Sequence, residues 1–385
     1  MAIVVQKYGG SSVADSDKIA LVARHVARTK NAGHQLVVVV SAMGKATENL
    51  LALARTIASD PPRRELDMLV STGERVTMAL MSMALSTLGC DAVSFTGSQS
   101  GIITNDRHFD AQIIEVRPHR IEDELARGRV VIVAGYQGMS YRREITTLGR
   151  GGSDTTAVAL AAALGAERCE IYSDVDGIYS ADPRNVADAH HLPVIDYETM
   201  QEIAESGAKV LSARAVEWAR RHRVVIHARK TADYARPGSD KETRIEAEAR
   251  ALAAVIVVDE KLAWVRAPSA LSGELLAIVA KNEIPIRDAW FERETCLLLS
   301  LTSVPEFERT RQALLDAGAE QVRTDVACVS AVAVGVGRDA ARLAQIFEAL
   351  PSSTLSRAVS PLRVSSVLPK SDAGALERAW HALLA

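Results

Sequence analysis

Two glycine-rich turns carry the residues best suited to phosphate chemistry. The first, at 7–12, reads Lys-Tyr-Gly-Gly-Ser-Ser and follows an apolar run at 3–5. The second, at 147–156, reads Thr-Leu-Gly-Arg-Gly-Gly-Ser-Asp-Thr-Thr and leads into an alanine-rich stretch that ends at Leu164. Glycine lets backbone N–H groups converge on a ligand, and the start of the following helix adds a partial positive charge. The two turns together predict an enzyme that handles phosphate.

Neither turn follows the commoner phosphate-binding motifs. A P-loop ends in Gly-Lys-Ser/Thr, but the pair Gly44-Lys45 is followed by Ala46. The stretch 149–154 ends in Asp154, where a dinucleotide fingerprint needs a third small residue. The sequence also lacks a protein-kinase catalytic-loop string. We therefore expect a different phosphate-binding design.

Short apolar runs alternate with helix-like segments in the first two thirds of the chain, and these elements must position the turns. The helix-like segment at 17–31 has apolar residues at helical spacing, with Asp15 or Ser16 as a cap and Gly33 as a stop. The apolar runs show no polar alternation, which is typical of parallel strands that are buried on both faces. They lie at 3–5, 36–40, 130–134, 171–172 and 224–226. This pattern predicts an α/β domain with a mainly parallel sheet layered by helices.

The last third of the chain has a different order of predicted strands and helices. Turn-forming and charged residues gather at 235–242, which predicts a linker. Beyond it we expect strands at 253–258 and 262–266, a helix at 271–282, strands at 285–290 and 295–301, and a helix at 306–317. A second series follows, with a strand at 328–334, a helix at 339–350, strands at 355–358 and 364–368, and a last helix to 385. The two series predict two small α+β units in tandem, a repeat of about 60–70 residues.

Composition limits the class of protein. The chain has 385 residues, of which 48% are apolar and 24% charged, and its formal charge is -3. These values predict a soluble globular protein of two or three domains, without nucleic-acid or membrane partners. The four cysteines lie far apart and the first residues do not resemble a signal peptide, so we expect a cytoplasmic protein.

Six strings, in order and at the right spacing, resemble the aspartate kinases of the amino-acid kinase family. They lie at 7–13, 40–44, 71–75, 146–156, 172–184 and 207–211. The resemblance implies a catalytic domain at 1–235 with that family's fold, a linker at 236–250 and, more loosely, a tandem ACT-like regulatory region at 251–385. It implies transfer of the γ-phosphoryl group of ATP to the side-chain carboxylate of L-aspartate. In that family this is the first step toward lysine, threonine and methionine.

The resemblance also implies roles for individual residues. Lys7 and Asp154 would be catalytic, with Lys7 neutralising the moving phosphoryl group and Asp154 orienting Lys7 and the substrate. Arg150 would bind the α-carboxylate of aspartate and Glu74 its ammonium group. The other implied substrate-binding residues are Ser41, Thr47, Gly152 and Ser153. The implied nucleotide-binding residues are Lys7, Gly9, Gly10, Ser11, Ser173, Asp174, Tyr179, Asp182, Arg184 and Lys209.

The same resemblance leads to expectations about the metal ion, the oligomeric state and the feedback control of the protein. Mg2+ would be carried by the ATP phosphates, so we expect no metal site built from protein side chains. ACT-like units usually pair their sheets between chains, and we expect a homodimer or a larger homo-oligomer. The Pro-Gly turns typical of the regulatory units are missing at 266–273 and 335–339, which predicts weakened feedback control.

Two other functions remain open at this point. One is an amino-acid kinase that acts on a different acidic amino acid, such as glutamate, acetylglutamate or an aspartate analogue of specialised metabolism. The other is a catalytically silent amino-acid sensor. An intact set of Lys7, Arg150, Asp154 and Lys209 argues against the sensor.

Overall fold

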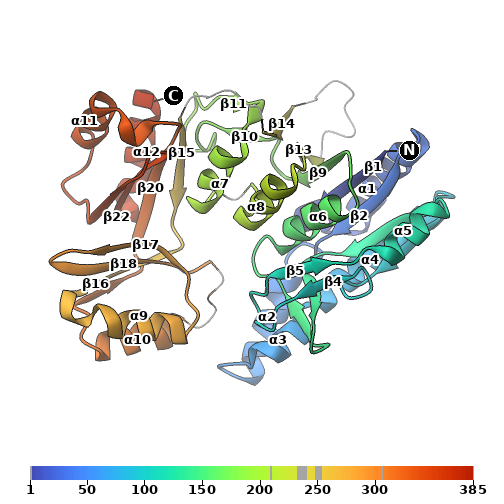
Figure 1. Cartoon of the computed structure of the whole chain (residues 1–385), viewed down its shortest axis with the longest axis horizontal. Helices are drawn as coiled ribbons and strands as arrows, with labels where there is room; N and C mark the ends of the chain where they lie inside the picture. The colour runs from blue at the N-terminus through green and yellow to red at the C-terminus, as the bar shows by residue number, and fades with distance from the viewer. Residues whose placement is uncertain are drawn as a thin grey trace. The chain divides into compact units, whose positions relative to one another are not determined.

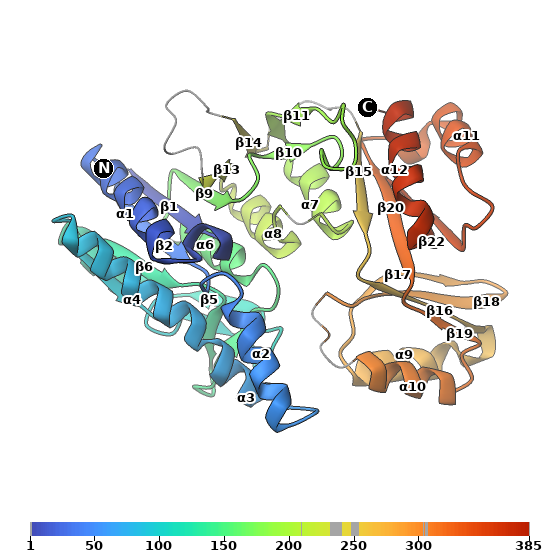
Figure 2. The same cartoon turned by 180° about the vertical axis from the view of Figure 1, so that it is seen from behind.

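The computed structural model describes residues 2–208, 210–231, 241–247, 254–302, 304 and 307–384, which form two compact units (Figures 1 and 2). The N-terminal unit consists of Met1–Ile178, Leu192–Gln201 and Val210–Arg250. The C-terminal unit consists of Tyr179–His191, Glu202–Lys209 and Ala251–Ala385. Within the described residues, every helix is too short or too polar to cross a membrane.

The N-terminal unit is built on an eight-stranded sheet, in the order β12-β14-β13-β9-β1-β2-β6-β3. Six of its pairings are parallel, and β13–β14 is antiparallel. The strands are β1 (Ile3–Tyr8), β2 (Gln35–Val40), β3 (Ala92–Phe95), β6 (Val130–Ala134), β9 (Arg168–Ser173), β12 (Val194–Ile195), β13 (Ile226–Lys230) and β14 (Glu242–Ile245). The predicted mainly parallel sheet is confirmed. β6 and residues 36–40 of β2 are unbroken apolar runs because both faces of the sheet are covered, and all of these residues are fully buried.

Helices cover both faces of this sheet. α1 (Ser16–Asn31) and α4 (Thr72–Thr87) share a core cluster with alternate residues of β1 and β2, including Val4 and Tyr8. α6 (Gly152–Ala163) is reached by Lys7, which points to the other face because neighbouring strand residues alternate. The remaining helices are α2 (Ala46–Ile57), α3 (Arg63–Val70), α5 (His119–Ala126), α7 (Tyr197–Glu205) and α8 (Ala213–His222). The cap predicted for α1 is present, because the Asp15 side chain accepts a hydrogen bond from the Lys18 N–H.

A smaller four-stranded sheet, which the apolar runs do not predict, lies beside the second glycine-rich turn. Its order is β5-β4-β7-β8, and β8 leads directly into that turn. These strands are short and partly polar, so they carry no clear apolar signal. They are β4 (Ile102–Thr104), β5 (Ile113–Val116), β7 (Gln137–Ser140) and β8 (Ile145–Thr147). A separate two-stranded sheet pairs β10 (Ile178–Tyr179) with β11 (His191–Leu192).

The segment 236–250, expected to be a linker, contributes β14 to the large sheet. β14 pairs with both β13 and β12. Residues 236–240 and 248–250 lie outside the described residues. The domain boundaries at 235 and 250 therefore stay predictions.

The C-terminal unit contains two four-stranded sheets, each with two helices. One sheet has the order β17-β18-β16-β19 and shares a core with α9 (Ser272–Lys281) and α10 (Phe307–Asp316). The other has the order β15-β20-β22-β21 and shares a core with α11 (Ala340–Glu348) and α12 (Lys370–Leu384). The strands are β15 (Val255–Asp259), β16 (Leu262–Pro268), β17 (Ile286–Phe291), β18 (Glu294–Ser300), β19 (Gln321–Arg323), β20 (Val326–Val332), β21 (Ser356–Val359) and β22 (Arg363–Pro369).

The predicted tandem order of the two small units is wrong in one respect. The sequence pattern places the strand expected at 253–258 in the first unit, but β15 pairs with β20 of the second sheet. Ile256 of β15 packs in the same core as Val329 and Trp380. An apolar run identifies a strand but not its partner, because pairing depends on which core the side chains complete. The first small unit is therefore inserted within the second.

Candidate active site

A nearly buried ion pair joins the two glycine-rich turns. Lys7, near the end of β1, places its Nζ 2.6 Å from Oδ1 of Asp154 in the first turn of α6. The side chains of Lys7 and Asp154 are 11% and 10% exposed. Removing two charges from water costs free energy, so a nearly buried ion pair is seldom retained without a function. An ion pair at the carboxyl end of a parallel strand is typical of a site for charged ligands. The structure thus brings together the two residues that the sequence predicts to be catalytic.

The first turn is pressed against the loop that follows β2. The Gly44 N–H donates to the Gly10 carbonyl oxygen at 3.0 Å, and the Ser41 N–H donates to the Tyr8 carbonyl oxygen at 3.1 Å. A Cβ at Gly10 would lie 2.9 Å from the Ala42 carbonyl oxygen, so only glycine allows this approach. The backbone of this turn ends beside Lys7, because a Cβ at Gly9 would lie 3.5 Å from Nζ of Lys7.

Glu74 presents a buried carboxylate near the first glycine-rich turn. It lies in the first turn of α4 and is 3% exposed. Its Oε1 accepts a hydrogen bond from the Ala42 N–H at 3.1 Å. Its Oε2 has no hydrogen-bond partner among the residues that the structure describes. Burial raises the pKa of Glu74 to about 8. An unsatisfied buried carboxylate is suited to receive a cationic group of a ligand.

The second turn holds Arg150 between two left-handed glycines. Gly149 and Gly151 both have φ of 71°. A Cβ at Gly149 would lie 2.7 Å from Oδ1 of Asp110, and a Cβ at Gly151 would lie 2.4 Å from Cβ of Ser212. Arg150 is exposed and makes no hydrogen bond or ion pair with another described residue. Its guanidinium group is thus available to a ligand that carries a carboxylate.

The other predicted residues of the N-terminal unit lie at the ends of the same elements. Ser41 follows β2 and Thr47 lies in the first turn of α2, and both are half-buried. Gly152 and Ser153 are buried at the start of α6. At the first turn, Ser11 is exposed. At the end of β9, Ser173 is half-buried and accepts a hydrogen bond from the Val175 N–H at 3.3 Å, and Asp174 is exposed.

Three predicted nucleotide-binding residues, Tyr179, Asp182 and Arg184, belong to the described part of the C-terminal unit. Tyr179 packs edge-on against the His191 ring, with centroids 5.3 Å apart. The Arg184 guanidinium pairs with the Asp182 carboxylate at 2.6 Å, and the Arg184 side chain is 84% exposed. Lys209 lies outside the described residues. The nucleotide-binding role of these four residues stays a prediction.

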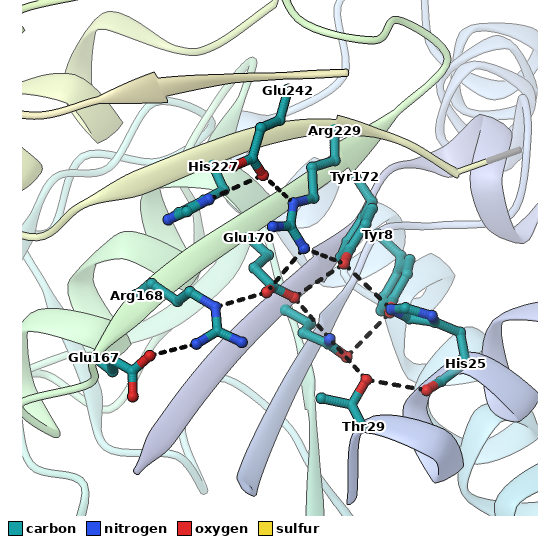
Figure 3. Close-up of polar contacts among 11 residues, drawn as sticks. Tyr8, His25, Thr29, Glu167, Arg168, Glu170, Tyr172, His227, Arg229 and Glu242 are labelled. Atoms are coloured by element: carbon teal, nitrogen blue, oxygen red, sulfur yellow. Dashed lines mark hydrogen bonds and ion pairs between the residues drawn. The ribbon is translucent and has the colours of Figure 1, made fainter. Parts of the chain in front are cut away.

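A charged cluster that the sequence analysis missed lies on the opposite face of β1 and β9 (Figure 3). Its centre is Glu170, which is 2% exposed and accepts hydrogen bonds from Gln6, Tyr172, Arg168 and Arg229. The rings of Tyr8 and Tyr172 stack with centroids 5.0 Å apart. Gln6 and Tyr8 flank Lys7, and Tyr172 precedes Ser173. The cluster therefore fixes the strand ends that carry the candidate site, and the polar residues within apolar strands were its only sequence signal.

A metal site made by the protein alone is not found in the described part of the chain. No group of three or more His, Cys, Asp or Glu side chains there could hold a metal ion. His190 and His191 lie in this described range and belong to no such group. The expectation that Mg2+ is carried by the nucleotide remains to be tested.

Comparison with protein families and curated proteins identifies relatives of this chain. Residues 2–228 match the model of the amino acid kinase family. The aspartokinase of Mycolicibacterium smegmatis is 57% identical over 232 residues, which cover 60% of this chain and 55% of that protein. The chain thus spans about half the length of that relative. The aspartokinase of Thermus thermophilus is 40% identical over 407 residues, which cover 99% of this chain and 98% of that protein.

Solved structures share the fold. Aspartokinase III of E. coli, crystallised with aspartate and ADP, superposes with a TM-score of 0.84 at 24% identity, over 99% of each chain. Aspartate kinase from Synechocystis gives a TM-score of 0.58 at 35% identity, over 99% of this chain and 69% of that chain. The likeness confirms the predicted fold class, an α/β kinase fold followed by two small α+β domains.

Proposed function

The chain belongs to the amino acid kinase family, and from this membership we propose that it transfers the γ-phosphoryl group of ATP to the side-chain carboxylate of L-aspartate, giving 4-phospho-L-aspartate. The observation that carries the proposal is the buried Lys7–Asp154 ion pair at the junction of two glycine-rich turns. The relatives support it, since those aligned over the shared kinase region and over the full length are named aspartokinases.

The ion pair fits the demands of phosphoryl transfer. This reaction needs little covalent chemistry and is catalysed mainly by positioning and by neutralising charge on the transferred group. Lys7 supplies the charge, and Asp154, at 2.6 Å, holds its ammonium group in place. Aspartate attacks as a carboxylate that is already ionised, so Asp154 has no proton to remove. Its role is orientation.

Nucleotide binding would use the first glycine-rich turn and a set of residues later in the chain. The backbone of Gly9, Gly10 and Ser11 cradles the phosphates beside Lys7. The remaining nucleotide contacts are Ser173, Asp174, Tyr179, Asp182, Arg184 and Lys209. Mg2+ rides on the ATP phosphates.

The amino-acid substrate needs charges of both signs around it. Arg150 offers a forked donor to the α-carboxylate, and Glu74 offers its unpaired Oε2 to the ammonium group. Binding the ammonium ion would offset the cost of ionising a buried carboxylic acid. Ser41, Thr47, Gly152 and Ser153 complete the pocket with hydroxyl and backbone donors.

The setting and control of the enzyme are part of the proposal. We place it in the cytoplasm, which is supported by four cysteines that form no disulfide. We propose a homodimer or larger assembly through the C-terminal unit, and weak feedback control. Weak control is supported by the sequence at 266–273 and 335–339, where the Pro-Gly turns typical of these regulatory units are missing.

An ADP-release assay tests the proposal. The purified protein with ATP and Mg2+ should release ADP with L-aspartate, and hydroxylamine should trap the acyl phosphate. Lys7→Ala should lower turnover by about two to four orders of magnitude, as loss of a preorganised charge contact does. Lys18→Ala, at a lysine side chain that is 49% exposed, is the matched control and should keep full turnover.

Three results would contradict this function. Release of ADP with glutamate or N-acetylglutamate but not aspartate would indicate a different amino-acid kinase. Absence of release with every acidic amino acid, together with measurable amino-acid binding, would indicate a sensor. Full turnover by Lys7→Ala would remove Lys7 from the mechanism.

A further inference from the structure

A fully buried carboxylate in α3, Asp67, is the starting point of a further inference. Its Oδ1 accepts hydrogen bonds from the Thr147 hydroxyl at 2.5 Å and from the Phe109 N–H at 3.1 Å. Its Oδ2 lies 2.6 Å from Nδ1 of His108. Asp67 itself is 0% exposed. A buried carboxylate is retained at such cost only where several donors compensate it, and here they all come from two segments beside the Arg150 turn.

The contacts of Asp67 join the two segments to each other. Thr147 is the last residue of β8 and directly precedes the turn that carries Arg150. His108 and Phe109 belong to the segment 105–111, and the Ala111 N–H donates to the Thr147 carbonyl oxygen at 2.8 Å. Phe109 has a left-handed φ of 69°, a conformation that is strained for a non-glycine residue. The hydrogen bond from its N–H to Asp67 helps to hold that conformation.

A second anchor grips the same turn one residue later. Arg214 of α8 donates to the Leu148 carbonyl oxygen at 3.2 Å and to Oδ2 of Asp110 at 3.0 Å. Asp110 in turn fills the space beside Gly149, where a Cβ would lie 2.7 Å from its Oδ1. The turn is thus held at Thr147 by Asp67 and at Leu148 by Arg214. Arg150 follows these two anchors and has no partner of its own in the described part of the chain.

We propose that Asp67 is a positioning residue that sets the direction of Arg150 toward the α-carboxylate of the amino-acid substrate, with Arg214 as its counterpart. The inference rests on the proposed function. A guanidinium group on an unanchored turn would have to be ordered at each binding event, and misplacement by about 1 Å can cost about a hundredfold. Nothing in the sequence motifs points to Asp67, because its partners lie in other parts of the chain.

The anchors act on the substrate side of the site only. Asp154 is held by α6, whose residues Gly152 to Ala161 are buried in the sheet packing. Lys7 is held by β1. Loosening Thr147 and Leu148 should therefore leave the ion pair and the phosphate cradle in place. If Asp67 had a purely structural role, its substitution would instead weaken the binding of both substrates together or lower only the melting temperature.

The test compares the KM for aspartate with the KM for ATP. Asp67→Ala should raise the KM for aspartate by about tenfold or more and change the KM for ATP by less than about twofold. Asp67→Asn keeps an acceptor for Thr147 and Phe109 and an amide toward His108, so it should restore most of the aspartate affinity. Glu65→Gln, at a carboxylate of the same helix that is 60% exposed, is the matched control and should change neither constant.

A second variant keeps the inference testable if Asp67→Ala does not fold. Arg214→Met retains the aliphatic stem but loses both donors, and it should shift the two KM values in the same unequal way. Equal changes in both constants, or no change in either, would overturn the inference while leaving the proposed function intact. An unsubstituted chain that releases no ADP with aspartate would overturn the proposed function and this inference together.

Discussion

Glu74 should make the capture of aspartate depend on pH. Burial raises the pKa of this carboxyl to about 8, from an ordinary value of 4.5. Only the ionised form attracts the substrate ammonium group, so binding should strengthen as the pH rises and should level off above about 8. About 1.5 pH units below that pKa only about 3% of Glu74 is ionised, and at the pKa half is ionised. We therefore expect kcat/KM for aspartate to rise about 15-fold between about pH 6.5 and 8.

The assay is the initial rate of ADP release at subsaturating aspartate and saturating ATP. The pH dependence of kcat/KM reports ionisation in the free enzyme, which is where Glu74 lacks a partner for Oε2. Glu74→Gln keeps an oxygen for the Ala42 N–H but cannot ionise. It should bind aspartate more weakly at about pH 8 and should lose the pH dependence.

Glu122→Gln serves as the matched control, because that carboxylate is 52% exposed on α5. It should follow the unsubstituted chain at every pH. The reasoning is refuted if Glu74→Gln shows the same 15-fold rise, since another group would then be titrating. It is also refuted if the unsubstituted chain shows a flat profile over this range.

Three further outcomes are expected. Arg150→Lys should raise the KM for aspartate by about tenfold and leave the KM for ATP unchanged, because a point charge does not replace a two-pronged donor; steady-state kinetics with each substrate varied in turn decides this. Gly151→Ala should lower the free energy of unfolding by more than about 2 kcal/mol, because φ is 71° and the new Cβ would lie 2.4 Å from Cβ of Ser212. Gly165→Ala, with nothing within 4 Å of the new Cβ, should lower the free energy of unfolding by less. Thermal denaturation of both variants measures the difference. Lysine and threonine, singly or together, should not inhibit at sub-millimolar concentration in the ADP-release assay, and such inhibition would show that the altered turns still bind an effector.

The fold was predictable where local patterns suffice. Unbroken apolar runs identified the buried strands, and glycine positions identified the two turns, since left-handed residues such as Gly149 and Gly151 need glycine. The small sheet beside the second turn was missed because its strands have three or four residues each. β15 was assigned to the wrong sheet because an apolar pattern does not encode a partner.

The sequence predicts which residue types form the site, but not the contacts that hold them in place. Lys7 and Asp154 were expected from motifs, and the structure adds that they meet at 2.6 Å. The Glu170 cluster and the Asp67 contacts were not expected, because each joins residues far apart in the chain. A polar residue inside an apolar strand, such as Gln6, indicates that a buried partner exists but not which one.

The pairing of β15 with β20 has a consequence for how the C-terminal unit can be divided. These strands form an antiparallel pair that reaches Asp259 opposite Cys328, and the whole first small sheet occupies the place of the hairpin turn between them. Its entry strand β16 and its exit strand β19 are themselves neighbours, with Trp264 opposite Arg323. The inserted unit could therefore be removed as one segment and replaced by a short loop. Division of the chain after residue 325 would instead separate β15 from β20, its partner strand in the second sheet. Two chain crossings, and not one flexible tether, join the two sheets.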